Sequence, residues 1–186
     1  MELKVCVLGS SRVGKTALCR ALTEQPLADG DYQPTCAVRI QEWTRQLGQE
    51  HVKVQLWDVA GGSQFQNYWE LMSKGVDGVL LLVDPSQPEQ ERQLEQLYLH
   101  FAQPNSLTMK QCLVLGLSVA RGAEAAAPPI WAGLRGKLKK LPSGYVALDI
   151  SAPDAGRKAA GDLLDKLLWG CLAQKKDMIE RSVMGE

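Results

Sequence analysis

One motif of eight residues constrains the fold of this chain more than any other feature. Residues 9–16 read Gly-Ser-Ser-Arg-Val-Gly-Lys-Thr and match the phosphate-binding pattern G-x-x-x-x-G-K-T. The apolar run Leu3–Leu8 predicts a strand before it, and Lys15–Gln25 has the composition of a helix closed by Pro26. Backbone N–H groups in such a loop, with the start of the helix, attract phosphate oxygens. The motif therefore predicts a nucleotide-phosphate site, against the alternative of a glycine-rich turn with a chance lysine.

The two residues that end the motif have separate roles in phosphate chemistry. Lys15 would reach the β- and γ-phosphates of a nucleotide, and the Thr16 hydroxyl would bind Mg²⁺. The whole predicted phosphate-binding set is Gly9, Ser10, Ser11, Arg12, Val13, Gly14, Lys15, Thr16 and Ala17.

Two further segments fall where a phosphate-bound metal would need them. The alternating run Val52–Leu56 leads to Asp58, whose carboxylate we expect to hold Mg²⁺, commonly through water. Thr35 comes just before a predicted strand, and its hydroxyl would complete the metal ligands and respond to the γ-phosphate, with Tyr32 covering the phosphates. Thr16, Thr35 and Asp58 are therefore the predicted metal ligands.

The rest of the chain alternates predicted strands with predicted helices. The expected elements are an antiparallel hairpin over 38–56 with its turn at Gly48, a buried strand at 78–84, a helix capped by Ser86 and Glu89, a buried strand at 112–117, a loop at 118–129, a short helix at 130–141, a strand at 145–150 and a terminal amphipathic helix containing 163–172. This alternation indicates a doubly wound α/β fold. We expect a mostly parallel six-stranded sheet with one antiparallel edge hairpin.

Composition and charge narrow the function classes. The 186 residues fit one domain, and 21 basic residues balance 21 acidic ones. With no net field to attract nucleic acid or an anionic membrane, we expect neither as a partner. The longest apolar run, Val79–Val83, is far shorter than a membrane span, so we expect a soluble chain that is not secreted. Five scattered cysteines without a C-x-x-C pair predict free, buried thiols in a reducing compartment.

Several spacings resemble those of the Ras-like small GTPases, and of the Rab group most closely. Thr35 and Trp57 stand 22 positions apart, as in Rab proteins, and the Phe, Gly and Gly of the Rab pattern correspond to Phe65, Gly75 and Gly78. Further stretches are similar to the Rab-like subunits of intraflagellar transport complex B, and the likeness covers nearly the whole chain. These stretches are residues 32–42, Phe65 with Trp69, and 103–107 followed by Gln111-Cys112.

The resemblance implies a P-loop small-GTPase (Ras-like) fold that binds GTP or GDP with Mg²⁺. It places Gly61, the glycine of the Asp-x-x-Gly motif, among the nucleotide-binding residues, and it implies that the backbone of Ser151 and Ala152 meets the guanine oxygen. It also implies docking on the coiled-coil subunits of intraflagellar transport complex B, without self-association. The implied location is the cytoplasm and the cilium or flagellum with its basal body.

The chain departs from the small-GTPase pattern around both the γ-phosphate and the base. Gly62 stands where active members have the Gln that orients the attacking water, so we expect slow hydrolysis at most and no confident catalytic residue. Gln64, two residues further on, could orient the water in its place only if the following helix began with a different geometry. Residues 116–119, Gly-Leu-Ser-Val, replace the Asn-Lys-x-Asp motif that selects guanine, a loss that would weaken base binding about 10- to 150-fold. Ala28 stands where an aromatic side chain stacks on the base.

The C-terminal segment carries no recognisable lipid-attachment signal. Residues 181–186 lack a prenylation motif, and the nearest cysteine, Cys171, lies within the amphipathic helix pattern. We therefore expect no direct membrane anchor. The nucleotide-binding domain is predicted over residues 1–175, followed by a charged, flexible tail over 176–186.

Five tryptophans among eleven aromatic residues offer candidates for a contact surface. Trp57 and Trp169 fall in apolar patterns that predict core positions. Trp43 and Trp69, with Tyr68, lie on segments that would flank the γ-phosphate, so they predict a partner surface, against the alternative of ordinary packing.

Three functions remain open from the sequence. The favoured one is a nucleotide-binding interaction subunit of the transport particle. A regulatory GTPase that turns over as a switch is the second, and Gly62 argues against it. The third is a nucleotide-free pseudo-GTPase scaffold, which the phosphate and metal residues, Lys15, Thr16, Thr35 and Asp58, argue against.

Overall fold

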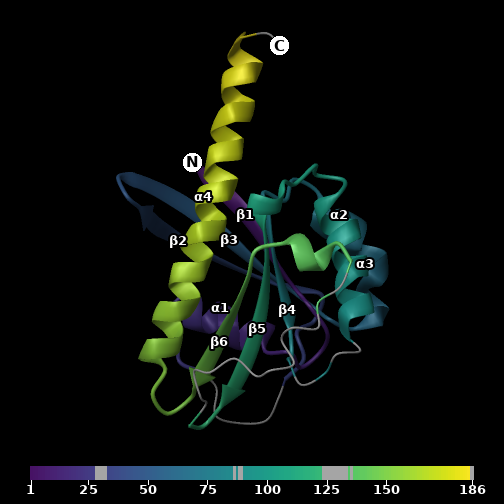
Figure 1. The fold of residues 1–186 in the computed structure, drawn as a ribbon, viewed down its shortest axis with the longest axis vertical. Coiled ribbons are helices and arrows are strands. Elements are labelled where there is room, and N and C mark those ends of the chain that lie inside the picture. Colours follow the sequence, from purple (N-terminus) through teal and green to yellow (C-terminus); the bar gives the residue numbers. More distant parts are fainter. Residues whose placement is uncertain (28–32, 86, 88–89, 123–133, 135, 185–186) are drawn as a thin grey trace.

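The computed structural model describes residues 1–27, 33–85, 87, 90–122, 134 and 136–184, which form one sheet with helices on both faces (Figure 1). Its strands are β1 (Glu2–Leu8), β2 (Val38–Leu47), β3 (Glu50–Val59), β4 (Gly78–Val83), β5 (Cys112–Ala120) and β6 (Ser143–Asp149). Its α-helices are α1 (Lys15–Leu22), α2 (Trp69–Ser73), α3 (Glu91–Ala102) and α4 (Asp154–Met184). Its short 3₁₀ helices are η1 (Ser63–Tyr68), η3 (Met109–Gln111) and η5 (Leu138–Lys140).

The strands form a six-stranded sheet in the order β2-β3-β1-β4-β5-β6. β2 pairs with β3 in antiparallel orientation, and every other pairing is parallel. Gly48, with a φ of 59°, forms the hairpin turn, because a left-handed backbone there suits glycine. This architecture confirms the expected doubly wound α/β sheet with one antiparallel edge hairpin.

The side chains of β1 alternate between two hydrophobic cores, one on each face of the sheet. Leu3, Val5 and Val7 belong to the core that α1 and α4 cover, whereas Cys6 and Leu8 belong to the core that α2 and α3 cover. All of β4 is buried, as its continuous apolar sequence predicts for a strand covered on both faces. The sheet is therefore the middle of three layers (Figure 1).

The sheet order brings two loops together at one edge. β1 lies between β3 and β4, and the chain leaves the parallel strands β1 and β3 at the same end. Ligands of doubly wound sheets bind at such a point, where the strand order reverses. Because Val7 pairs with Asp58 in the register, the loop after β1 and the end of β3 meet there.

The first helix is shorter than its prediction. It ends at Leu22 rather than at Gln25. The Thr23 hydroxyl and backbone N–H both donate to the Cys19 carbonyl, at 2.9 and 3.1 Å, and the next residue, Glu24, leaves the helical conformation with a φ of 57°.

The fifth strand is longer than its prediction. β5 runs to Ala120, past the expected end at Leu117, because residues 118–120 pair in register with residues 147–149 of β6. The expected loop therefore begins later, and the rest of its range, from residue 123, lies outside the described residues. Of the helix expected at 130–141, the described part holds the 3₁₀ helix Leu138–Lys140.

α3 covers the sheet where a crossover helix was expected. It begins at Glu91 and buries Leu94, Leu97 and Phe101 on one side. The predicted capping residues Ser86 and Glu89 lie outside the described residues.

Residues 176–184, which were expected to belong to a flexible tail, continue the terminal helix. α4 continues as a helix to Met184, and its 31 residues span about 46 Å. Lys175 pairs with Asp77 at 2.8 Å and Lys176 pairs with Glu50 at 2.7 Å, which ties the helix to the sheet where the tail was expected to begin. Beyond these pairs the helix projects past the body of the molecule (Figure 1). Across the described residues, no helix combines the length and the apolar character that crossing a membrane requires.

Two tryptophans exchange the places predicted for them. Trp69, expected on a partner surface, is only 6% exposed and packs edge-on against Phe101 with ring centroids 6.1 Å apart. Trp169, expected in the core, is 47% exposed. Both predictions were wrong, because each placed a side chain from its own segment without the neighbours that cover or uncover it.

The remaining tryptophan predictions have mixed outcomes. Trp57 is half-buried rather than fully in the core, with the Lys4 ammonium 3.7 Å from the centre of its ring. Trp43 is also half-buried and packs against the core under α1 and α4. Trp131 lies outside the described residues.

Four of the five cysteines are buried free thiols, as predicted, and Cys36 is exposed. Burial raises the pKa of Cys6 and of Cys112 to about 12, so these two thiols stay protonated near neutral pH.

Candidate nucleotide-binding site

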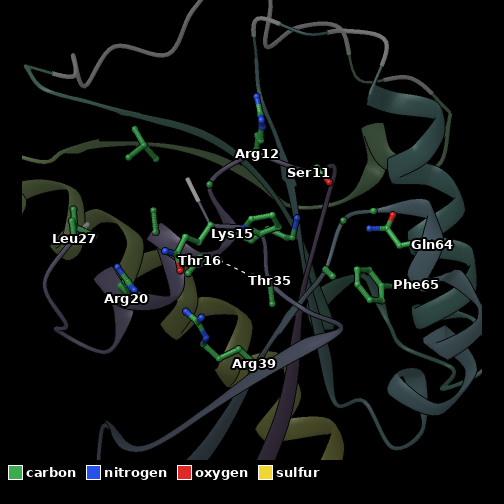
Figure 2. Close-up of a pocket in the computed structure, with 18 residues that line it drawn as sticks. Ser11, Arg12, Lys15, Thr16, Arg20, Leu27, Thr35, Arg39, Gln64 and Phe65 are labelled. Atoms are coloured by element: carbon green, nitrogen blue, oxygen red, sulfur yellow. Dashed lines mark hydrogen bonds between the residues drawn. The ribbon is translucent and has the colours of Figure 1, made fainter. Parts of the chain in front are cut away.

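A cavity of about 630 Å³ opens at the edge of the sheet where β1 and β3 end. This size is typical of a small-molecule site. Predicted residues that line it are Ser11, Arg12, Gly14, Lys15, Thr16, Ala17, Thr35 and Gly61 (Figure 2). The loop after β1, the segment before β2 and the end of β3 therefore build one site, although they lie up to 50 positions apart in the sequence.

The phosphate-binding loop is held in place by close packing at Gly14. This residue has a φ of 91°, and a Cβ there would lie 2.7 Å from Leu117 Cδ2. Glycine is required at such a left-handed position pressed against a neighbouring strand. The loop is therefore seated on the end of β5, directly before the first turn of α1.

Lys15 lies under the loop with its ammonium among backbone oxygens. Its side chain is buried, and Nζ donates to the Gly9 carbonyl at 2.9 Å and to the Ser10 carbonyl at 2.7 Å. Burial lowers the pKa of Lys15 to about 8, while the Asp58 carboxylate acts in the opposite direction. A phosphate at the loop would favour the charged ammonium again, since a nearby anion stabilises the charged form.

Asp58 gathers the two predicted hydroxyl ligands around one carboxylate oxygen. Thr16 Oγ1 donates to Asp58 Oδ2 at 2.6 Å, and Thr35 Oγ1 donates to the same oxygen at 3.2 Å. The two threonine hydroxyls are 3.1 Å apart (Figure 2). Three residues from three separate segments thus meet as the sequence pattern predicts.

The other oxygen of this carboxylate is unusual. Asp58 is fully buried, yet its Oδ1 has no hydrogen-bond partner. A buried carboxylate oxygen without a partner is costly unless a cation or water meets it. One carboxylate and two hydroxyls are oxygen ligands of the kind Mg²⁺ takes, with phosphate and water completing the shell. The residues therefore fit a magnesium ion that is held jointly with a nucleotide.

A metal held by protein carboxylates or imidazoles alone does not fit the site. Within the residues that the structure describes, no group of three or more His, Cys, Asp or Glu side chains could hold an ion. An ion at this site would therefore need the threonine hydroxyls and oxygens of a bound ligand in addition to the Asp58 carboxylate.

Gly61 lies directly against the phosphate-binding loop. A Cβ at Gly61 would lie 2.5 Å from backbone atoms of Gly9, Ser10 and Ser11. No side chain fits there without moving the loop, so the backbone of Gly61 forms one wall of the cavity.

Gly62 lines the cavity without a side chain, at the position where the small-GTPase pattern has a Gln. Gln64 nevertheless lines the cavity, and a Cβ added at Gly62 would run into the Gln64 side chain. Figure 2 shows Gln64 and Phe65 on the same wall. The 3₁₀ geometry of η1, with three residues per turn, brings Gln64 to this wall, which the sequence pattern alone does not reveal.

Two cations at the site were not predicted. Arg20 and Arg39 both line the cavity and lie on its Thr16 side (Figure 2). In the described part of the chain neither one forms an ion pair. Arg20 comes one helical turn after Thr16, and this spacing could have predicted that its side chain lies on the same side of the helix as Thr16. Arg39 follows Thr35 on a strand, where the sequence carries no such signal.

Three of the residues that line the cavity are apolar, namely Ala17, Leu27 and Val119. None of the described lining residues carries a carboxylate, in keeping with the missing Asn-Lys-x-Asp motif. Tyr32 and Ala28, expected near the phosphates and the base, lie outside the described residues.

Ser151 and Ala152 lie in the loop after β6 and are exposed, but they are not among the lining residues. The Ser151 hydroxyl and backbone N–H both donate to Asp149 Oδ1, at 2.5 and 2.8 Å. These bonds lower the pKa of Asp149 and order the loop.

Comparisons with known proteins agree with this site. A family model described as "Ras of Complex, Roc, domain of DAPkinase" matches residues 4–117. The Chlamydomonas reinhardtii protein named "Intraflagellar transport protein 22" is 50% identical over 186 residues, covering 99% of this chain and 96% of that protein. The Danio rerio protein "Intraflagellar transport protein 22 homolog" is 29% identical over 190 residues, covering 98% of each. The Homo sapiens protein of that name is 28% identical over 140 residues, covering 70% of this chain and 75% of that protein.

The family match contains the phosphate-binding loop, Thr35 and Gly61, which contribute lining residues to the cavity, and it also contains the buried Asp58. The match to the Chlamydomonas protein runs through α4 as well, so it is not confined to the nucleotide site. These matches confirm the resemblance to Ras-like GTPases and to their intraflagellar transport members. The chain belongs to the intraflagellar transport protein 22 family of Ras-like GTPases.

Proposed function

We propose that this chain binds GTP or GDP together with Mg²⁺ in the cavity at the ends of β1 and β3. The observation that carries the proposal is the buried Asp58 carboxylate, which holds the Thr16 and Thr35 hydroxyls on one oxygen and leaves the other without a partner. Thr16, Thr35 and Asp58 would hold the metal, and Lys15 and the loop backbone would hold the phosphates. Bound Mg²⁺ would neutralise charge on the β- and γ-phosphate oxygens.

The side chains at the γ-phosphate end favour retention of the nucleotide over rapid hydrolysis. Gly62 has no amide to orient a water molecule. Gln64 lines the cavity, but its place on η1 differs from the position directly after Gly61 that orients water in the family pattern. We therefore propose slow hydrolysis at most, with nucleotide binding as the main activity.

Mass spectrometry of the nucleotide released from purified protein tests the proposal directly. We expect GDP or GTP, and calorimetry with added nucleotide should show a Mg²⁺-dependent affinity. In Asp58→Ala the Mg²⁺ dependence should disappear, whereas Asp162→Ala, which removes an exposed acid of α4 outside the cavity, should keep it. A wild-type protein that binds neither nucleotide, with or without Mg²⁺, would leave only the scaffold function.

The relatives' names support a role in transport along cilia and flagella. The Chlamydomonas relative is named as an intraflagellar transport protein and matches nearly the whole chain. We propose that this chain is a subunit of intraflagellar transport complex B, docks on its coiled-coil subunits, and occurs in the cytoplasm, the basal body and the cilium or flagellum.

The surface beside the γ-phosphate remains the best docking candidate, but with different residues from those the sequence suggests. Trp69, the first residue of α2, is buried against α3 and is not available to a partner. Its neighbours Tyr68 and Leu71 are 53% and 69% exposed. Ile40, also exposed, pairs with Trp57 across the hairpin, so both side chains project to the face of the sheet that carries α2. Exposed apolar side chains on adjoining elements are typical of interfaces.

A charge introduced into this apolar surface tests the docking proposal. Leu71→Glu should weaken binding to purified coiled-coil subunits by at least about 2 kcal/mol, the threshold for an interface hot spot, and should leave nucleotide affinity unchanged. Met178→Glu, on an equally exposed apolar residue of α4, is the matched control. Loss of binding in the control alone would move the docking surface to α4.

A further inference from the structure

Gln93, on α3, connects the two loops that form the phosphate end of the cavity. Its Oε1 accepts a hydrogen bond from Ser10 Oγ at 2.7 Å, and its Nε2 donates to the Gly61 carbonyl at 3.3 Å. Ser10 belongs to the phosphate-binding loop and Gly61 follows β3. One side chain from a third segment therefore bridges both walls.

The chemistry of the partners fixes which way the amide points. A backbone carbonyl accepts hydrogen bonds and cannot donate them, so the NH₂ group must face Gly61. The amide oxygen then faces Ser10, whose hydroxyl can donate. Neither Asp nor Glu could make both contacts, because an ionised carboxylate only accepts.

The body of α3 holds Gln93 in place. The next residue, Leu94, is 1% exposed in the core that α2 and α3 share, and Leu97 is 3% exposed one turn later. Gln93 itself is half-buried at the sheet-facing side of the helix. The bridge is therefore anchored to a helix that is packed into the core, and not to another loop.

The backbone of Gly61 has little room to move, because it lies between the phosphate-binding loop and the Gln93 side chain. The space where its Cβ would lie is already occupied by the backbone of Gly9, Ser10 and Ser11 at 2.5 Å. Gln93 donates a hydrogen bond to the Gly61 carbonyl, and the backbone of the phosphate-binding loop packs against the Gly61 Cα. Since Gly61 lines the cavity next to Thr35 and Lys15, its position determines the shape of the wall that a third phosphate would meet.

We propose that Gln93 is a positioning residue that sets the preference between nucleoside triphosphate and diphosphate. This proposal rests on the proposed function, because it assumes that the cavity binds a nucleotide. Gln93 holds the Gly61 wall ready for the γ-phosphate. A diphosphate leaves that wall unused, so only the triphosphate benefits from the bridge.

The test compares two nucleotides in three variants of the full chain. Calorimetry measures the dissociation constants of GDP and of a non-hydrolysable GTP analogue, each with Mg²⁺, in Gln93→Ala, Gln93→Glu and the control Gln96→Ala. Gln96 is exposed on the same helix, one turn after Gln93. We expect Gln93→Ala to weaken the GTP analogue about 3- to 10-fold, the range for one or two lost hydrogen bonds, with the GDP constant unchanged within about twofold.

Gln93→Glu separates positioning from packing. It keeps the side-chain volume and the contact with the Ser10 hydroxyl, but it places a carboxylate oxygen against the Gly61 carbonyl. We expect the same selective loss of the GTP analogue as in Gln93→Ala, with an unchanged unfolding temperature of the nucleotide-free protein. Gln96→Ala should match the wild type for both nucleotides.

The outcomes distinguish this proposal from the proposed function. If wild type binds both nucleotides and Gln93→Ala keeps their ratio, or weakens both equally, Gln93 has no role in selecting the triphosphate and the inference is overturned while nucleotide binding stands. If wild type binds neither nucleotide, the proposed function fails first.

Discussion

The two ends of the cavity are built in different ways. At the phosphate end, charged and polar groups converge: Lys15, Thr16, Thr35 and the buried Asp58 all lie within or beside the loop after β1. Elsewhere its described lining residues include Ala17, Leu27 and Val119, which offer apolar contact. Under the proposed function, fixed donors and a metal would recognise the phosphates, whereas the base would meet no carboxylate among the described lining residues.

The largest expected effect comes from the phosphate end. Lys15→Ala should weaken nucleotide binding by at least about 100-fold, because it removes the charge-assisted contacts of a buried ammonium. The fold should persist, since Lys15 belongs to neither hydrophobic core. Calorimetry measures the affinity and circular dichroism the fold, with the exposed Lys139→Ala as control. Wild-type affinity in Lys15→Ala would show that the loop is not the site.

The second prediction compares how much affinity the phosphates and the base each contribute. Removing both phosphates, from GDP to guanosine, should cost at least about tenfold more affinity than exchanging the base, from GDP to ADP, since each charge-assisted contact contributes about 1.5–3 kcal/mol. Competition binding with the three ligands on wild-type protein gives both ratios. A base exchange that costs as much as phosphate removal would mean that the base end holds directed contacts after all.

The third prediction concerns pH and the charge at the phosphate end. The pKa of Lys15 is about 8 in the free protein, and a bound phosphate raises it, so binding takes up a proton above that pH. Affinity should be constant below about pH 8 and should fall by up to about tenfold per pH unit above it. Calorimetry in buffers of different ionisation heat counts the protons. A constant affinity up to about pH 9.5 would contradict the low pKa.

The smallest expected effect concerns the gap at Gly62. Wild-type hydrolysis should not exceed about 10⁻⁴ s⁻¹, the unstimulated range of Ras-type enzymes. Gly62→Gln should raise this rate, because the end of the Gln64 side chain, which a new Cβ would meet, is free to turn away. Gly62→Ala supplies the Cβ without the amide and should leave the rate unchanged. A wild-type rate near one per second would show that another group orients the water.

The sheet and the phosphate end could be predicted because local patterns specify them. The G-x-x-x-x-G-K-T motif fixes a loop between a strand and a helix, and alternation over Val52–Leu56 fixes the face that Asp58 presents. Once the parallel order is known, the register brings Val7 and Asp58 together without further information. Short-range pattern and one topology rule therefore account for this half of the site.

The failed predictions depend on contacts between distant segments. Trp69 follows a 3₁₀ helix whose three residues per turn shift the phase of the helix, and its cover, Phe101, comes from α3. Trp169 adjoins the buried Leu168, but the 100° step between neighbours turns it away from the sheet. Gln93 has no motif of its own, because its proposed role arises from contacts with Gly61 and Ser10, which precede it by 32 and 83 positions.

The two halves of α4 differ in the free energy needed to open their backbone hydrogen bonds, because only the first half is packed against the sheet. Up to Leu172 its apolar side is buried, and opening the backbone there requires opening the core. Beyond Lys176, Met178, Ile179 and Val183 are exposed, and the pair Arg181–Asp177 lies along the helix itself. Backbone amides in these last turns therefore exchange by local fraying, whereas those before Leu172 exchange only when the domain unfolds. The ion pairs of Lys175 and Lys176 mark the boundary between the two regimes.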